Sequence, residues 1–202
     1  MFLYHYFEKS VGPFRNLSDL SMDEAKLVIE NIRESRSDTY AAKRDENYMK
    51  RRAAYEELAR KLFIEKGGKP ERKAPHYMVV EECDWLKSWY KHGSFVKIPI
   101  EEFDLSKISF TYGDMHPTFS PIVNDGKEYR KKLYNYEEIL KIIEKYGLPQ
   151  YWNADGKFGP ERYIEVQVWS DEVIKKYYRL NTIKAEILKL ENDLLGSDTR
   201  KS

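Results

Sequence analysis

Alternating apolar and polar positions predict most of a sheet. Along residues 108–112 the larger side chains, ending with Tyr112, fall on one face of an extended chain, because successive side chains point in opposite directions. Residues 162–169 alternate in the same way, with Glu165 on the face opposite to the aliphatic side chains. Similar runs predict further strands over residues 2–7, 76–80, 95–100 and 128–134.

Two of these strands carry signs of their position in the sheet. Rings occupy both faces of residues 2–7, so we expect this strand in the interior of the sheet. Pro99 has no N–H to donate to a neighbour, which places residues 95–100 at an edge or a strand end.

Capping residues mark three helices. Ser21 and Glu24 have the spacing of a capping box and predict a helix from this point to about residue 35. A longer helix is predicted over residues 39–66, and Asn135 caps a third over residues 136–146. We expect these side chains of the first two helices to face inward: Leu27, Val28, Ile29, Ile32, Tyr48, Tyr55, Leu58, Leu62 and Phe63.

The C-terminal part predicts one more helix, over residues 171–196. Its apolar side chains recur at spacings of three and four, a pattern that serves either for docking on the same domain or for pairing with a second copy in a homodimer. The last residues, 197–202, are predicted to be disordered. The apolar positions of this helix are Leu180, Ile183, Ile187, Leu190 and Leu194.

Together these elements predict one α+β domain over residues 1–170. Its mostly antiparallel or mixed sheet carries helices packed on it, and a helical pair, residues 21–66, is inserted after the first strand. A length of 202 residues suits a single domain with an appended helix.

Composition narrows the classes of protein. The 35 basic and 34 acidic residues nearly cancel, so no overall charge favours nucleic acid or an anionic membrane surface. No apolar run is long enough to cross a bilayer, and residues 1–8 lack the basic start of a signal peptide, so we expect a cytoplasmic protein. Cys83 is the single cysteine, which excludes an internal disulfide and a cysteine-based metal site.

Most motifs of known chemistry are missing. The sequence has no phosphate-binding glycine-rich loop with its lysine, no H-E-x-x-H, no cysteine pair and no G-x-S-x-G. The spacing of the four histidines gives no support for a metal site with Asp114 or Glu165, and we predict none. His5 has two interpretations, a hydrogen-bonded core residue or a ligand-binding one.

The helical pair carries a basic face with two interpretations. Arginines and lysines between tyrosines suit a surface that binds phosphates, but interleaved acids also suit a solvated face held by its own ion pairs. The basic residues are Arg33, Arg36, Lys43, Arg44, Lys50, Arg51 and Arg52.

Candidate chemistry lies at two strand ends. Asp114 and His116 follow the strand 108–112, where Gly113 breaks the extended chain and Pro117 disfavours a helix at His116. They form either a pocket wall or an ordinary turn. Glu165 lies mid-strand among polar rings and is either solvated or part of an aromatic pocket, where burial would raise its pKa or Arg162 would anchor it.

Five segments resemble a family of bacterial proteins whose function is uncharacterised. They read P-H-Y-M-V-V, I-P-I-E-E-F-D, I-S-F-T-Y-G-D, Y-G-L-P-Q and P-E-R-Y-I-E-V-Q-V-W, and the resemblance covers most of residues 2–170. This resemblance implies no activity.

More distantly, the order of elements is similar to the ADP-ribosyltransferase fold. That resemblance implies NAD as cofactor, with His5 orienting it, Tyr77 or Tyr112 stacking on nicotinamide, and Glu165 stabilising positive charge. Arg162 would add a cofactor contact, and Asp114 and His116 would lie near the acceptor. The sequence departs from the family pattern with E-V-Q on the late strand, no S-T-S and the extra helical pair.

Two functions therefore follow as hypotheses. The first is a nucleotide-handling transferase, and the second is a non-catalytic module that binds protein or nucleic acid through the basic face or the C-terminal helix. Because basic and acidic residues nearly cancel, we expect nucleic acid less than protein as the partner of such a module.

Overall fold

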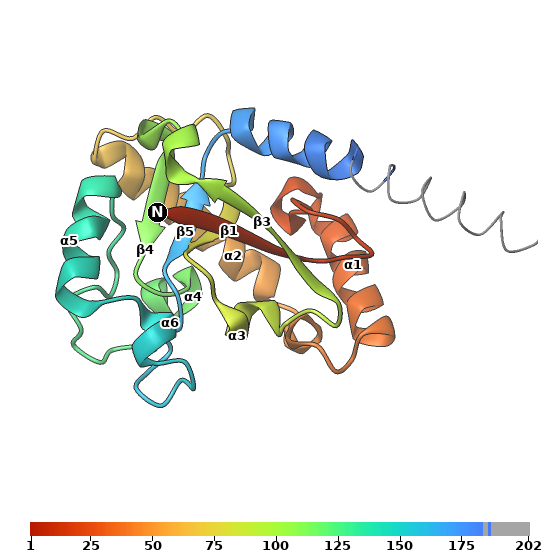
Figure 1. The fold of residues 1–202 in the computed structure, drawn as a ribbon. Coiled ribbons are helices and arrows are strands. Elements are labelled where there is room, and N and C mark those ends of the chain that lie inside the picture. The colour runs from red at the N-terminus through yellow and green to blue at the C-terminus, as the bar shows by residue number, and fades with distance from the viewer. Residues whose placement is uncertain (184–185, 187–202) are drawn as a thin grey trace, which may run out of the picture.

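The computed structural model describes residues 1–183 and residue 186, and within them the chain is an α+β domain built on one antiparallel sheet (Figure 1). The strand order is β3-β1-β2-β5-β4, so β1 lies inside the sheet and β3 at an edge, as predicted. The strands are β1 (Phe2–Glu8), β2 (His76–Val80), β3 (Gly93–Pro99), β4 (Ile108–Thr111) and β5 (Glu165–Val168).

Register sorts the side chains into two faces. Leu3 pairs with Val80 and Ile98, and Val166 pairs with Phe110, so the aliphatic positions of all five strands share what we call the first face. This face packs beneath α5 (Tyr136–Tyr146) in the main hydrophobic core. The alternation predicted from the sequence is confirmed, because burial of these side chains supplies most of the favourable free energy of folding.

The second face carries Val79, Thr111 and Glu165, which occupy paired positions on β2, β4 and β5. The helix α2 (Tyr48–Glu65) and the short helix α4 (Met115–Phe119) pack together over this face around Trp169. The helix α1 (Met22–Ser35) packs in turn on the start of α2. The inserted helical pair is therefore the outer layer on one side of the sheet.

The start of α1 is confirmed, since Ser21 and Glu24 form the expected capping box. Its buried face differs from the prediction. Ala25, Ile29 and Ile32 are buried, while Leu27 and Val28 are exposed. Successive residues turn by about 100° around a helix, so four neighbouring apolar positions cannot all face inward.

The second helix begins later than predicted. Residues Tyr40–Lys43 form a short 3₁₀ helix, and α2 begins at Tyr48. Between them Asp45 accepts a hydrogen bond from the backbone N–H of Asn47 at 2.9 Å, a local turn that competes with helix formation. Leu58, expected on the buried side, is exposed.

The strand predicted over residues 128–134 is wrong. A single bridge joins Tyr134 to Phe110, and Lys131 has a φ of 58°, which interrupts an extended chain. The backbone N–H of Lys131 instead donates to the carbonyl of Thr118 at 2.9 Å.

The third predicted helix is confirmed as α5, which Asn135 caps and Gly147, with a φ of 73°, terminates. Two single-turn helices, α3 (Asp84–Lys87) and α6 (Pro149–Trp152), complete the described connections. No helix in the described part of the chain has the length and apolar character required to span a bilayer.

The C-terminal helix occupies residues 172–183 of the described chain. Its first turn buries Val173 and Ile174 in the main core, so this part docks on the same domain. Leu180 and Ile183 are about half exposed. The other apolar positions of the predicted pairing surface and the predicted tail lie outside the described residues, and the homodimer stays a prediction.

We predict that Phe110→Ala lowers the free energy of unfolding by about 3–5 kcal/mol, because Phe110 is fully buried on the first face and its removal leaves a cavity. Phe95→Ala is the matched control, since Phe95 lies on edge strand β3 and is 39% exposed. Chemical denaturation of both variants checks the prediction. Equal losses would show that the first face is not the main core.

Candidate functional site

A cavity of about 650 Å³ lies between the sheet and the helical insertion. Its walls come from β1, β2, β5, the loop that follows β1, the C-terminal end of α1, the start of α2, the end of α3 with the turn after it, and the start of α4. Its volume lies in the range of small-molecule sites. Rings form much of the wall: Tyr4, Tyr6, Phe14, Tyr48, Tyr55, Tyr77, Trp89, Tyr90 and Tyr163.

Glu165 is held in this cavity by a ladder of buried polar side chains on the second face of the sheet. Trp169 donates its indole N–H to Ser109 at 2.8 Å, and Ser109 donates its hydroxyl to Gln167 at 2.9 Å. Gln167 then donates its amide N–H to Oε1 of Glu165 at 3.1 Å and contacts Thr111 at 3.2 Å. We call these five residues the polar ladder. It fixes the carboxyl group in one orientation.

The surroundings of Glu165 favour its protonated form. Burial, and then the negative charge of Asp114, raise its pKa well above the usual value, although Gln167 and Arg52 act in the opposite direction. Oε1 of the carboxyl group accepts the amide N–H of Gln167. Of the two interpretations of Glu165, the structure therefore supports the aromatic pocket.

Asp114 and His116 enter the cavity wall through α4. Asp114 caps this helix by accepting the backbone N–H of His116 at 2.6 Å, and its other oxygen accepts the hydroxyl of Tyr163 at 2.8 Å. The prediction that Pro117 keeps His116 out of a helix is wrong. In the first turn of a helix the missing N–H of proline costs nothing, because that group has no partner within the helix.

The imidazole of His116 is available for chemistry. It stacks on Tyr48 with ring centres 5.2 Å apart and meets the edge of Tyr55, also at 5.2 Å. Burial lowers its pKa, and the guanidinium groups of Arg52, Arg51 and Arg44 lower it further, against the charge of Asp114. Its ring nitrogens have no hydrogen-bond partner among residues 1–183, so a neutral ring presents an open acceptor.

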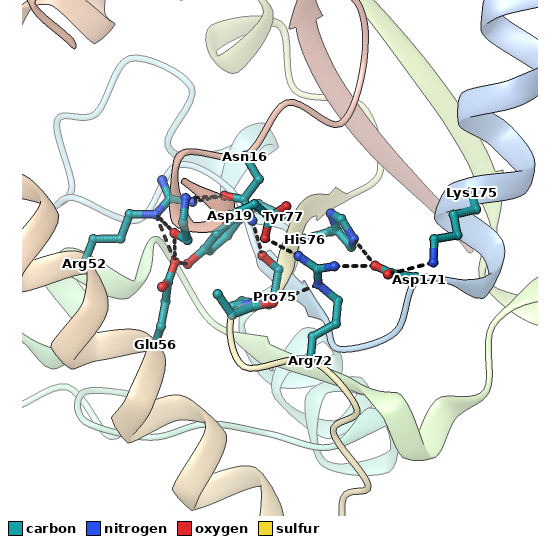
Figure 2. A network of polar contacts seen from close by, with 12 residues as sticks. Asn16, Asp19, Arg52, Glu56, Arg72, Pro75, His76, Tyr77, Asp171 and Lys175 are labelled. Carbon is teal, nitrogen blue, oxygen red and sulfur yellow. Dashed lines mark hydrogen bonds and ion pairs between the residues drawn. The ribbon is translucent and has the colours of Figure 1, made fainter. Parts of the chain in front are cut away.

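A cluster of buried charges joins the insertion to the sheet (Figure 2). Arg52 on α2 donates to Glu56 at 2.9 Å, and its guanidinium lies 4.4 Å from the ring centre of Tyr77 on β2. Tyr77 donates its hydroxyl to the same carboxylate at 2.5 Å, and Ser18 does so at 2.6 Å. This Arg52 cluster holds the far wall of the cavity against the sheet.

A second cluster fastens the edge of the cavity to the C-terminal helix (Figure 2). Arg72 bridges Asp19 and Asp171, and His76 hydrogen-bonds to Asp171 at 2.8 Å. Lys175 contacts the same carboxylate at 3.1 Å. The pKa of Asp171 is lowered because its hydrogen bonds to His76 and Lys175 and the charge of Arg72 outweigh its burial.

His5 is half-buried in the cavity wall, and both of its ring nitrogens contact the backbone, so they are not free to orient a ligand. Its Nδ1 contacts the carbonyl of Tyr77 at 2.9 Å, and its Nε2 accepts the backbone N–H of Phe14 at 2.8 Å. Burial lowers its pKa to about 4. β1 pairs with β2 at Leu3 and Tyr4, and His5 is the next residue along β1.

The residues expected to assemble an NAD site do not all meet in the cavity. Tyr112 packs against Tyr129 in the main core on the first face and donates its hydroxyl to Gly147 at 2.8 Å, so it cannot stack on a ligand beside Glu165. Arg162 lies on the ring of Trp85 at 4.0 Å and is not an anchor for Glu165. Tyr77 does line the cavity, but Arg52 covers its ring.

Sequence reasoning missed the roles of Arg52 and Glu56. Their i, i+4 spacing was a signal for an ion pair, but the basic face was interpreted as either solvated or phosphate-binding. In the structure the side chain of Arg52 is mostly buried, Arg36 and Arg44 line the cavity, and Arg51 pairs outward with Asp45.

No three His, Cys, Asp or Glu side chains of the described residues gather in a way that could hold a metal ion. Comparison of the chain with protein-family models, curated proteins and solved structures gives no match. The two family resemblances described from the sequence therefore stay predictions, and the site is interpreted from its own chemistry.

We predict that Arg52→Met lowers the free energy of unfolding by about 3–5 kcal/mol, because it leaves Glu56 as an uncompensated buried charge. Arg51→Met is a matched control on the same helix, since Arg51 pairs with Asp45 at the surface. Urea denaturation of the two variants measures the difference. If Arg51→Met cost as much, the Arg52 cluster would not be what fastens the insertion.

We predict that Glu165→Gln gains stability relative to wild type as the pH rises from about 5 to about 9. A carboxyl group with a raised pKa stabilises the fold fully below its unfolded pKa, near 4.5, and loses that contribution as the pH rises toward the folded pKa. Glutamine keeps the shape and stays neutral. Thermal unfolding of both proteins at a series of pH values provides the measurement.

The control is Glu57→Gln, which removes an exposed carboxylate from α2. Its difference from wild type should not grow with pH. A flat difference for Glu165→Gln as well would mean that Glu165 is ionised in the folded protein.

Proposed function

We propose that this protein is an enzyme that binds a small organic molecule in the cavity and transfers protons with His116 as base and Glu165 as acid. One observation carries the proposal. A carboxyl group fixed by the polar ladder and an imidazole with open ring nitrogens line the same ring-walled cavity.

His116 suits the role of base because its environment favours the neutral ring. Burial lowers its pKa, so it can accept a proton near neutral pH. Asp114 caps the helix that carries His116 and bears a negative charge nearby, which stabilises the imidazolium formed when the proton arrives.

Glu165 suits the role of acid because the same environment keeps it protonated at pH values where an exposed glutamate is ionised. The polar ladder holds Oε1, so the carboxyl group that gives the proton has a defined orientation. Catalytic groups must be held by their neighbours to act with fixed geometry, and the ladder meets this requirement.

The two roles define a class of reaction. His116 takes a proton from one atom of the ligand, Glu165 gives a proton to another, and the electron pair of the broken bond to hydrogen moves through the ligand between them. An isomerisation or an elimination fits this balance, with the proton returning from His116 to Glu165 through solvent to complete the cycle.

The NAD-dependent transferase expected from the distant resemblance has less support. That chemistry needs an ionised glutamate beside a positive centre and a ring stacked on nicotinamide. Here the pKa of Glu165 is raised, and Tyr112 lies on the other face of the sheet. Of the site residues expected from the sequence, three have a role in the proposed acid–base chemistry: Glu165, Asp114 and His116.

The alternative of a nucleic-acid-binding module also has less support. The basic residues of the helical pair do not form one outward face, because the side chain of Arg52 is mostly buried and Arg36 and Arg44 line the cavity. The arginine that faces outward, Arg51, is paired with Asp45. We therefore place the function in the cavity.

We predict that the wild-type protein converts at least one compound in a mixture of small metabolites. Mass spectrometry of the mixture measures this conversion. His116→Asn and Glu165→Gln should each slow this conversion by about 100-fold or more, the usual contribution of a positioned acid or base. Both variants should still bind the converted compound, because glutamine has the shape of glutamate and asparagine is smaller than histidine, so neither replacement blocks the cavity.

The matched controls are His92→Asn and Glu57→Gln, which change exposed residues outside the cavity wall. They should convert the compound at the wild-type rate. The proposal fails if the wild-type protein changes no compound, or if the cavity variants are as active as these controls.

A further inference from the structure

We propose that the ligand carries an anionic group, a phosphate or a carboxylate, which pairs with Arg44 and Arg36 at the end of the cavity formed by the helical insertion, while a flat ring of the same molecule lies between the aromatic walls. The inference rests on the proposed function, since it concerns the substrate of the same cavity. It assigns a ligand contact to two arginines that take no direct part in the proton transfers.

Arg44 is half-buried in the cavity wall and lacks a charged partner. Its guanidinium carbon lies 4.8 Å from the ring centre of Tyr48, the ring that also stacks on His116. Its backbone is held in place, because Arg33 donates to its carbonyl oxygen. Within the described chain no carboxylate comes within ion-pair distance of its guanidinium. A cation partly removed from water gains from an anionic partner.

Arg36 is also half-buried in the cavity wall. It forms the C-terminal cap of α1, and Thr39 donates both its backbone N–H, at 3.0 Å, and its hydroxyl, at 2.7 Å, to the carbonyl of Arg36. Arg36 and Thr39 both line the cavity. Among residues 1–183 its guanidinium also has no ion-pair partner.

The acidic residues of the cavity wall cannot neutralise these arginines. Glu8 accepts the backbone N–H groups of Lys91 and His92 through its two oxygens. Asp19 pairs with Arg72, and the two oxygens of Asp114 accept from His116 and Tyr163. With Glu165 protonated, the cavity keeps unpaired positive charge at one end. An anionic ligand supplies the missing partner.

The walls indicate the rest of the ligand. Trp89 and Tyr90 line the cavity together with Arg44, and aromatic faces and guanidinium planes both stack well on flat rings. Arginine also binds phosphate and carboxylate through two parallel hydrogen bonds. A flat ring carrying one such group, as in a nucleoside monophosphate or an aromatic carboxylate, therefore matches both features of the cavity.

The test is a binding panel measured by thermal shift and then by calorimetry. The probes are the four common nucleoside 5′-monophosphates, the matching nucleosides, a set of benzoates and inorganic phosphate. We expect at least one ring-bearing anion to raise the melting temperature, because a ligand of the folded state stabilises it. Its neutral counterpart should bind at least about tenfold more weakly.

Arg44→Met and Arg36→Met should each weaken binding of that anion by about tenfold or more, and leave binding of the neutral counterpart unchanged. Arg51→Met is the matched control, because Arg51 lies on the neighbouring helix and pairs with Asp45 outside the cavity wall. It should bind as wild type does. Whether the nucleotides or the benzoates respond identifies the source of the anionic group.

The inference is overturned if no ring-bearing anion binds, if neutral and anionic forms bind equally, or if Arg51→Met has the same effect as the two cavity variants. Inorganic phosphate that binds as tightly as the best ring-bearing anion would overturn the role of the ring. If the anion binds through Arg44 but His116→Asn and Glu165→Gln leave its conversion unchanged, the subsite stands and the proposed acid–base function fails.

Discussion

The cavity depends on a buried carboxyl group that has a hydrogen-bond partner on one side and open space on the other. A buried polar group that lacks a hydrogen-bond partner lowers the stability of the folded protein by about 1–3 kcal/mol. The polar ladder offsets this cost by giving Gln167 partners on both sides, Ser109 toward Trp169 and Glu165 toward the cavity. The second face of the sheet can therefore hold a fixed acid without exposing it to solvent.

The helical insertion completes the site. Without α1 and α2 the second face of β1 and β2 would be open, and Glu165 would lose much of the burial that raises its pKa. The Arg52 cluster prevents this by joining α2 to Tyr77 through Glu56, and a buried ion pair of this kind is strongly sensitive to loss of either partner (Figure 2). An insertion that looked peripheral in the sequence thus sets the electrostatics of the sheet residues beneath it.

Local signals in the sequence predicted the elements well, and contacts between distant segments were harder. The capping boxes at Ser21 and Asn135 and the alternation of β5 gave correct elements, because each depends on neighbouring residues. The partnership of Arg52 with Tyr77 could not be predicted in this way, since it depends on how the insertion folds back over the sheet. The face of the sheet on which Tyr112 lies could be predicted from the alternation of side chains along its strand, because Tyr112 shares the apolar side with Phe110.

Tyr48 connects the two ends of the proposed site. Its ring contacts both His116 and the guanidinium of Arg44, and the positive charge of Arg44 contributes to the lowered pKa of His116. An anion bound at Arg44 would cancel part of that charge and make His116 a stronger base. By the same coupling, protonation of His116 would strengthen binding of the anion, since both charges act on one cavity. The empty site would keep His116 neutral and ready, and the bound ligand would increase its affinity for the proton that it must remove.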